Sequence, residues 1–186
     1  MAITISKSQI QAALPKIAVG MNQYLWLQRQ VEKGGKFYND SEFQRKYNHF
    51  YRVRRGQDWR NIYYSLMGKA IDEQLPFETV INHIYTETGR VEASFASKLF
   101  ATANPTFPVI DSVVYGNLGL ITPGPNHPDR IKVICQQYEI LTNIFNDYLT
   151  KEEGINLIAE FDMAYPYVKD RLTNQKKLDL VLWQNR

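Results

Sequence analysis

The sequence predicts an all-α protein, and three observations support this fold class. Apolar residues recur at spacings of three and four along most of the chain, which is the period of a helix that buries one face. Residues that begin helices, such as Asp58, Pro76 and Asp111, stand just before these periodic runs. No segment alternates regularly between polar and apolar residues, as a half-buried strand would. We therefore expect about eight to ten helices.

The first half of the chain contains four expected helices. Ser41 and Gln44 have the spacing of a capping box, in which two side chains satisfy backbone N–H groups where a helix begins. Asp58 follows a glycine turn and is the expected N-cap of the next helix. Pro76 suits a first helical position, because its missing N–H needs no partner there. The four expected helices are residues 41–54, 59–70, 76–89 and 91–103.

A proline-rich segment separates these helices from the rest of the chain. Pro105 and Pro108 prevent a continuous helix, because proline lacks an N–H and restricts the residue before it. Asp111 can cap a short helix, which Gly119 ends. The β-rich run at residues 107–115 competes with the all-α prediction, but it is short and Asp111 interrupts it. After a loop at 122–128, the remaining expected helices are 131–148, 156–165 and 176–184.

The composition is typical of a globular protein, with 186 residues, 44% hydrophobic and 22% charged. This length predicts a single domain spanning residues 1–186. The one cysteine, Cys135, excludes an internal disulfide, a cysteine-rich zinc site and an iron–sulfur cluster. It fits a reducing compartment, so we expect a cytoplasmic protein. We find no targeting segment and no run long enough to span a membrane, so we expect no membrane partner.

The positive charge is concentrated in one part of the sequence. The whole chain carries +3, but residues 29–69 hold ten basic and four acidic residues and carry +6, which leaves −3 for the remainder. The densest cluster contains Arg52, Arg54 and Arg55, and Arg60 follows it. Basic side chains interleaved with aromatic ones can bind nucleic-acid phosphates and stack on bases. The alternative is a solvated helix end whose arginines complement the helix dipole.

A more specific pattern lies at residues 89–114, where a glycine turn, a helix and a proline loop lead to Phe107-Pro-Val-Ile-Asp111-Ser-Val-Val114. This pattern resembles the signature of the helix-hairpin-helix DNA glycosylases, most of all the adenine-mismatch glycosylases. The resemblance implies a two-lobed helical bundle, with residues 41–120 as the central lobe and residues 1–40 with 121–186 as the packing lobe. It also implies monofunctional hydrolysis of the N-glycosidic bond of a damaged or mismatched base, with DNA as partner and without a metal or cofactor.

The resemblance assigns a role to several residues. Asp111 would be the catalytic carboxylate, which stabilises positive charge on the sugar and deprotonates or orients the attacking water. The turn at Gly89 and Arg90 would contact a DNA phosphate through backbone N–H groups. Further DNA contacts would come from Arg52, Arg54, Arg55 and Arg60, and walls for a flipped base from Tyr51 and Tyr115.

The sequence also departs from the family pattern. Val91 stands where the family hairpin usually has its second glycine. The positions near Glu92 and Ala93 lack the lysine nucleophile of bifunctional members, and Lys98 is expected to be a solvated charge without that role. We expect Trp183 to anchor the last helix in the core.

Three alternatives remain open from the sequence alone. Asp111 can be only an N-cap, which contributes about 1 kcal/mol to its helix. The protein can be a non-catalytic nucleic-acid-binding protein that uses the arginine cluster. It can also be a protein-interaction module in which tyrosines and phenylalanines form the interface.

Overall fold

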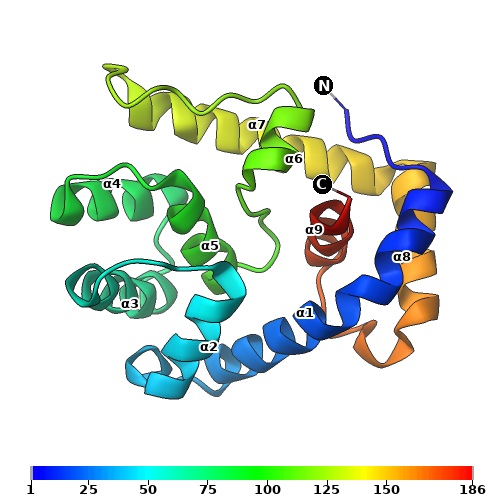
Figure 1. Ribbon diagram of the computed structural model, residues 1–186, viewed down its shortest axis with the longest axis horizontal. Coiled ribbons are helices and arrows are strands. Elements are labelled where there is room, and N and C mark those ends of the chain that lie inside the picture. The colour runs from blue at the N-terminus through cyan, green and yellow to red at the C-terminus, as the bar shows by residue number, and fades with distance from the viewer. Residues whose placement is uncertain (1, 186) are drawn as a thin grey trace.

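In the computed structural model, which describes residues 2–185, these residues form nine α-helices and two short 3-10 helices, with no strand among them (Figure 1). The all-α prediction is confirmed. In chain order the elements are α1 (Lys7–Lys33), η1 (Phe37–Asn39), α2 (Ser41–Tyr51), α3 (Gln57–Asp72), α4 (Phe77–Thr88), α5 (Ala93–Ala103), α6 (Ser112–Asn117), α7 (Arg130–Thr150), α8 (Glu152–Ala164), η2 (Pro166–Val168) and α9 (Asn174–Gln184).

Helices α2 to α5 pack around a core of aromatic side chains. Helix α3 contacts α4 and α5, and η1 contacts both α2 and α3. Tyr47 of α2 and Tyr63 of α3 are fully buried, and their hydroxyl oxygens lie 3.0 Å apart. The Tyr63 hydroxyl also donates a hydrogen bond to the carbonyl of Phe95 on α5, at 2.9 Å. Because a buried hydroxyl needs a partner, these bonds fix how the three helices pack.

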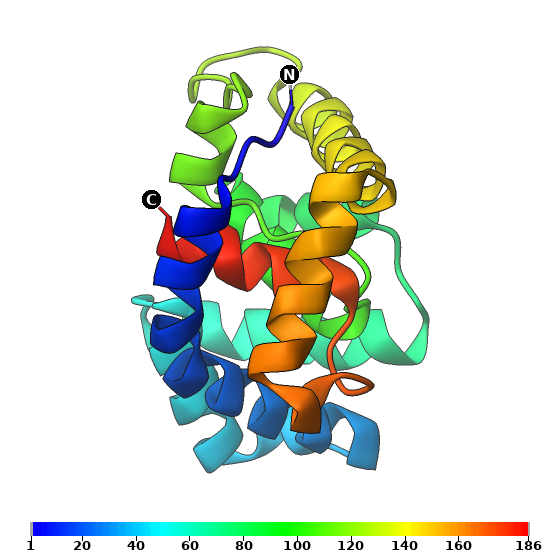
Figure 2. The same cartoon turned by 90° about the vertical axis from the view of Figure 1, so that its right-hand side faces the viewer.

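Helix α9 lies among α1, α7 and α8 and contacts all three (Figure 2). Its buried side chains include Leu178 and Val181. Lys177 is also buried, and its ammonium forms an ion pair with Asp162 of α8 at 2.6 Å. The same ammonium donates a hydrogen bond to the carbonyl of Lys169 at 3.0 Å. A buried charge needs such partners, so this pair fixes the position of α9 against α8.

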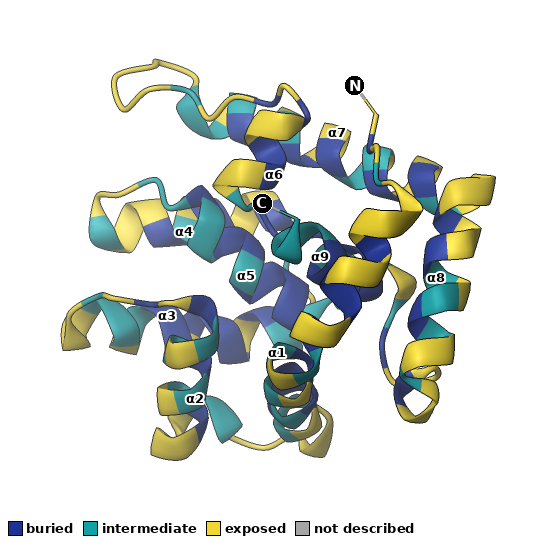
Figure 3. Cartoon of the chain, turned by 45° about the vertical axis from the view of Figure 1, so that its right-hand side comes forward, coloured by how far each residue is buried: buried dark blue, intermediate teal, exposed yellow. Residues whose placement is uncertain are grey.

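The helices expose one face and bury another, as the sequence periodicity predicts (Figure 3). Helix α1 contacts both groups of helices, since it packs against α2 and α5 as well as α8 and α9. A second connection is the contact of α4 with α7. Within residues 2–185, no helix is both long and apolar enough to cross a membrane.

Two predicted helix caps are wrong. The N-cap of α2 is Asp40, whose carboxylate accepts the N–H of Phe43 at 2.7 Å, so Ser41 already belongs to the helix. Gln44 does not complete a capping box but donates to the carbonyl of Tyr38 at 2.7 Å. The N-cap of α3 is Gly56, which leaves Asp58 in the first turn. An acidic side chain there is favourable because it faces the positive end of the helix dipole.

Candidate functional site

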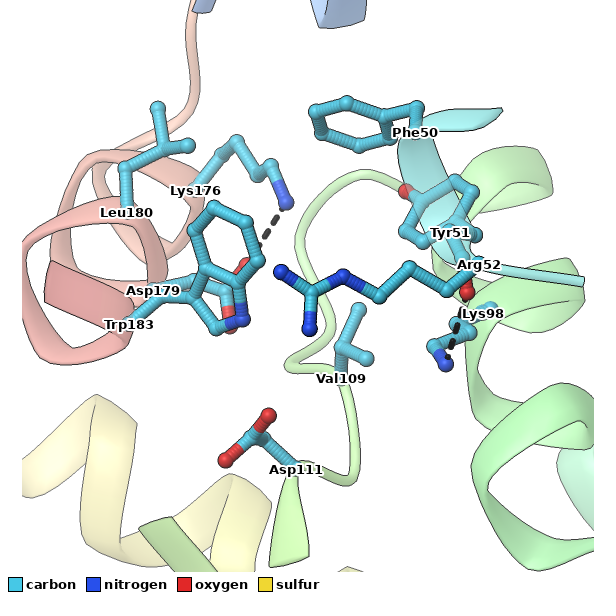
Figure 4. A pocket seen from close by; sticks show the side chains of 10 residues that line it. All are labelled: Phe50, Tyr51, Arg52, Lys98, Val109, Asp111, Lys176, Asp179, Leu180 and Trp183. Carbon is cyan, nitrogen blue, oxygen red and sulfur yellow. Dashed lines mark hydrogen bonds and ion pairs between the residues drawn. The ribbon is translucent and has the colours of Figure 1, made fainter. Parts of the chain in front are cut away.

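A cavity of about 140 Å³ lies between the C-terminal end of α2, helix α5, the proline loop (residues 104–111) and α9 (Figure 4). Five of the side chains that line it carry charge. Two are the carboxylates Asp111 and Asp179, and three are the basic side chains Arg52, Lys98 and Lys176. Charges of both signs beside one small cavity can bind a ligand that both donates and accepts hydrogen bonds.

Aromatic and aliphatic side chains complete the lining of this cavity. Phe50 and Tyr51 come from the end of α2, and Trp183 comes from the last turn of α9. Val109 and Leu180 add apolar surface. The Trp183 ring lies at the cavity wall and is half-buried, so the prediction that it anchors the core is wrong. A flat ring beside charged groups is suited to stack on a planar ligand.

Asp111 is held in place by the proline loop before it and by α6 after it. Its carboxylate caps α6, since Oδ1 accepts the N–H groups of Val113 at 2.9 Å and Val114 at 3.3 Å. The loop is fixed on α5, because the N–H of Ile110 donates to Ser97 Oγ at 2.9 Å. It is fixed on α7 as well, through the hydrogen bond that the Tyr138 hydroxyl donates to the carbonyl of Pro108 at 2.8 Å. Asp111 therefore combines a capping role with a fixed position at the cavity.

Lys98 lines the same cavity as Asp111, and the prediction that it is a solvated charge is wrong. Its ammonium donates a hydrogen bond to the carbonyl of Tyr51 at 3.2 Å and lies 5.0 Å from the centroid of the Phe95 ring. Burial lowers the pKa of Lys98 below its ordinary value, and the nearby charge of Asp111 opposes this shift. The hydrogen bond to the Tyr51 carbonyl, at the C-terminal end of α2, holds the Lys98 ammonium at the cavity wall.

Helix α9 presents three cavity residues that the sequence did not single out as a set. Lys176, Asp179 and Trp183 are spaced by three and four residues, so they share one helix face. Lys176 Nζ lies 2.6 Å from Asp179 Oδ2 and 4.6 Å from the centroid of the Tyr24 ring. Burial lowers the pKa of Lys176, but the charge and hydrogen bond of Asp179, together with Tyr51, outweigh it, and the net shift is upward. The buried Lys176 and the half-buried Asp179 therefore form an ion pair at the cavity.

The predicted DNA-binding residues are divided between two places, since Arg55, Gly89 and Arg90 line one surface hollow, whereas Arg52 lines the cavity. Arg52 reaches the cavity, and Arg54 is exposed outside it. Arg55 forms an ion pair with Glu92 at 2.7 Å. Arg60 donates to the carbonyl of Arg55 at 2.6 Å, which holds it along the protein surface.

The glycine turn belongs to a second, more open hollow of about 760 Å³, which shares no lining residue with the cavity. Gly89 ends α4 with a φ of 67°, a left-handed conformation that glycine adopts without strain. Arg90, Arg130 and Lys132 line the same hollow. Val91 lines it too, in place of the second hairpin glycine. The glycine turn is therefore not part of the cavity that contains Asp111.

The two predicted base-pocket tyrosines lie in different places. Tyr51 lines the cavity, whereas Tyr115 is buried in the core and is not part of the cavity lining. Cys135 is half-buried, and burial raises the pKa of its thiol to about 11, so it is protonated at neutral pH. Among residues 2–185, no three His, Cys, Asp or Glu side chains are placed to hold a metal ion.

No protein-family model matches the chain, and comparison with curated proteins and with solved structures gives no significant match. The function is therefore inferred from the cavity and from the sequence pattern around Asp111.

Proposed function

We propose that this protein hydrolyses the N-glycosidic bond of a damaged or mismatched DNA base. The observation that supports this most is the position of Asp111 at a small cavity that also has the aromatic rings of Trp183 and Tyr51 in its wall. A glycosylase needs these two elements together, because the flipped base requires a flat surface to stack on and the sugar requires a nearby carboxylate.

The reaction assigns one chemical task to Asp111. The bond between the sugar C1′ and the base nitrogen breaks, and its electron pair leaves with the base. The sugar then carries positive charge, which the Asp111 carboxylate stabilises. A water oxygen bonds to C1′, and Asp111 accepts the proton that this water loses. The departing base takes up a proton from solvent, so the products are a free base and an abasic sugar.

The charge of the surface supports a nucleic-acid partner. Arg54 and Arg90 are exposed, and Arg130 and Lys132 line the hollow beside the glycine turn. These cations can neutralise backbone phosphates while the base enters the cavity beside Arg52. Phosphates at the hollow and a base at the cavity would place the DNA backbone across α5.

The decisive experiment separates catalysis by Asp111 from capping by Asp111. Asparagine caps a helix about as well as aspartate, so Asp111→Asn should change the free energy of unfolding by less than about 0.5 kcal/mol. It should reduce single-turnover base release by about 100-fold or more, because the carboxylate is lost. Asp111→Ala should lose the same activity and also about 1 kcal/mol of stability.

A second candidate function is DNA binding without chemistry. The two N–H groups that Asp111 caps favour it, since they give this carboxylate a structural role that needs no catalysis. Wild-type protein that releases no base from a broad panel of lesions, yet binds DNA in a salt-dependent way, would establish this second candidate instead of the first.

A further inference from the structure

We infer that the cavity selects lactam bases, in which a ring N–H lies next to a carbonyl, and rejects bases with an unprotonated ring nitrogen at that position. Hypoxanthine, guanine and uracil belong to the first class, and adenine and cytosine to the second. The inference therefore departs from an adenine substrate, although the motif around Asp111 most resembles that of adenine-mismatch glycosylases. The inference rests on the proposed function, since it requires a flipped base in the cavity. It assigns base selection to Asp179, on α9, far in sequence from the motif around Asp111.

The Asp179 carboxylate is a fixed hydrogen-bond acceptor in the cavity wall. Lys176 holds it at 2.6 Å, and the Lys176 ammonium is itself fixed between the rings of Tyr24 and Phe50, whose centroids lie at 4.6 Å and 5.7 Å. An ionised carboxylate has no donor, but it can accept several hydrogen bonds. A ring N–H facing Asp179 is therefore stabilised. A ring nitrogen lone pair facing it is repelled and loses its water without a replacement.

Lys98 supplies the complementary donor on another wall. Its ammonium has three N–H groups, and one of them is used by the carbonyl of Tyr51. Figure 4 shows Asp179 and Trp183 on one side of the cavity and Lys98 on the opposite side, with Asp111 below them. A base stacked on Trp183 would thus meet an acceptor on one side and a donor on the other. The ring N–H of a lactam faces Asp179, and Lys98 can donate to an acceptor on another edge of the same base.

The Arg52 side chain indicates which kind of chemical group fits beside Asp179 and Trp183. Its guanidinium points toward Asp179 and Trp183 in Figure 4, with Cζ 5.7 Å from the centroid of the Trp183 ring. A guanidinium is planar and presents N–H donors in its plane. Arg52 is exposed, so it can leave this place when a ligand enters. A flat ligand that replaces it has to supply an N–H donor to Asp179, as a lactam does.

The test compares bases that differ only at this edge. Four otherwise identical duplexes carry hypoxanthine, adenine, uracil or cytosine at one position. Single-turnover base release is measured with wild-type protein, and equilibrium binding is measured with Asp111→Asn. We expect each lactam base to be preferred over its amino counterpart by at least about 100-fold in release, because a site that pairs a polar group strongly rejects the analogue that lacks it. The binding preference should have the same direction.

Asp179→Asn tests the residue itself. Its amide both donates and accepts, so it can face either class of base, and the lactam preference should fall at least about tenfold. Asp147→Asn is the control, because it removes a carboxylate that is also paired with a lysine, Lys151, but on the exposed surface of α7 and outside the cavity. It should leave the preference unchanged. If Asp179→Asn does not fold, the double variant Lys176→Met/Asp179→Asn removes both charges of the pair together.

The outcomes separate the inference from the proposed function. Release of adenine or cytosine in preference to the lactam bases would overturn the inference and leave the hydrolysis standing. Preferred binding of the lactam duplexes, without release of any base, would support the inference and contradict the proposed hydrolysis. Equal binding of all four duplexes, or an unchanged preference in Asp179→Asn, would overturn the assignment to Asp179.

Discussion

The Arg52 guanidinium carbon lies 5.7 Å from the centroid of the Trp183 ring, although the two residues come from opposite halves of the chain. Arg52 ends α2, and Trp183 lies in the last turn of α9. Their contact closes the cavity beside Asp111 with a cation on one side and a ring on the other. This part of the cavity is therefore formed by the ends of two helices that lie far apart in the sequence.

Arg52 occupies this position at a cost in backbone energy. Its φ of 55° and ψ of 44° are left-handed, and a residue with a Cβ adopts this conformation at a cost of about 1–2 kcal/mol. Arg52→Gly and Arg52→Ala both remove the guanidinium, but only glycine relieves the strain. We expect Arg52→Gly to be about 1 kcal/mol more stable than Arg52→Ala in denaturant unfolding. Equal stability would show that the conformation is not strained.

The buried tyrosines predict loss of stability at high pH. Burial raises the pKa of Tyr24, Tyr47, Tyr63 and Tyr138 well above the ordinary value. In the unfolded chain these hydroxyls lose their protons near pH 10, but in the folded protein they keep them. The stability they contribute is therefore complete below about pH 10 and is lost as the pH rises further.

Two optical signals check this prediction. Tyrosinate absorbance from the buried residues should appear together with the loss of helical circular dichroism in an alkaline titration. Tyrosinate absorbance that reaches its full amplitude while the helices remain intact would contradict it.

The helices were largely predictable because local chemistry determines them. Asp111 caps α6 as its sequence context indicates, and the proline loop ends α5. Helix α1 was harder to predict, since Pro15 and Gly20 interrupt its pattern. Its capping box at Ser6 and Gln9 is a signal that could have revealed it.

The cavity was only partly predictable because it depends on distant contacts. Asp111 and Tyr51 could be proposed from the motif and from residue type. Lys98 looked solvated in sequence because nothing nearby indicates the carbonyl of Tyr51, 47 residues earlier, to which it donates. Asp179 and Trp183 reach Asp111 only through the packing of α9 among α1, α7 and α8. Their spacing alone places Asp179 and Trp183 on one helix face, but it does not predict which residues that face contacts.

Gly154 provides a test of the junction between α7 and α8. A Cβ at this position would overlap the carbonyl oxygen of Tyr148 and lie 2.9 Å from the Cα of Leu149. Both neighbours are backbone atoms, which cannot rotate away, so Gly154→Ala should destabilise the fold by about 1–3 kcal/mol. Gly116→Ala is the control, since a Cβ there meets no atom within 4 Å. The midpoint of thermal unfolding should fall for Gly154→Ala alone; a fall of the same size in both variants would contradict this account.

The proposed DNA contacts predict different salt dependence for neighbouring arginines. Arg54 and Arg90 are exposed, so each can lose counterions to a phosphate contact, whereas Arg55 is already paired with Glu92 at 2.7 Å. Each phosphate contact contributes about 0.9 to the slope of log K against log salt. Arg54→Ala and Arg90→Ala should therefore each reduce the slope by about one, and Arg55→Ala by less. Arg55→Ala should instead lower the free energy of unfolding, because the half-buried Glu92 loses its partner.

Fluorescence titrations of duplex DNA at several salt concentrations measure the slopes of log K against log salt. Identical slopes in wild type, Arg54→Ala and Arg90→Ala would remove both arginines from the proposed interface.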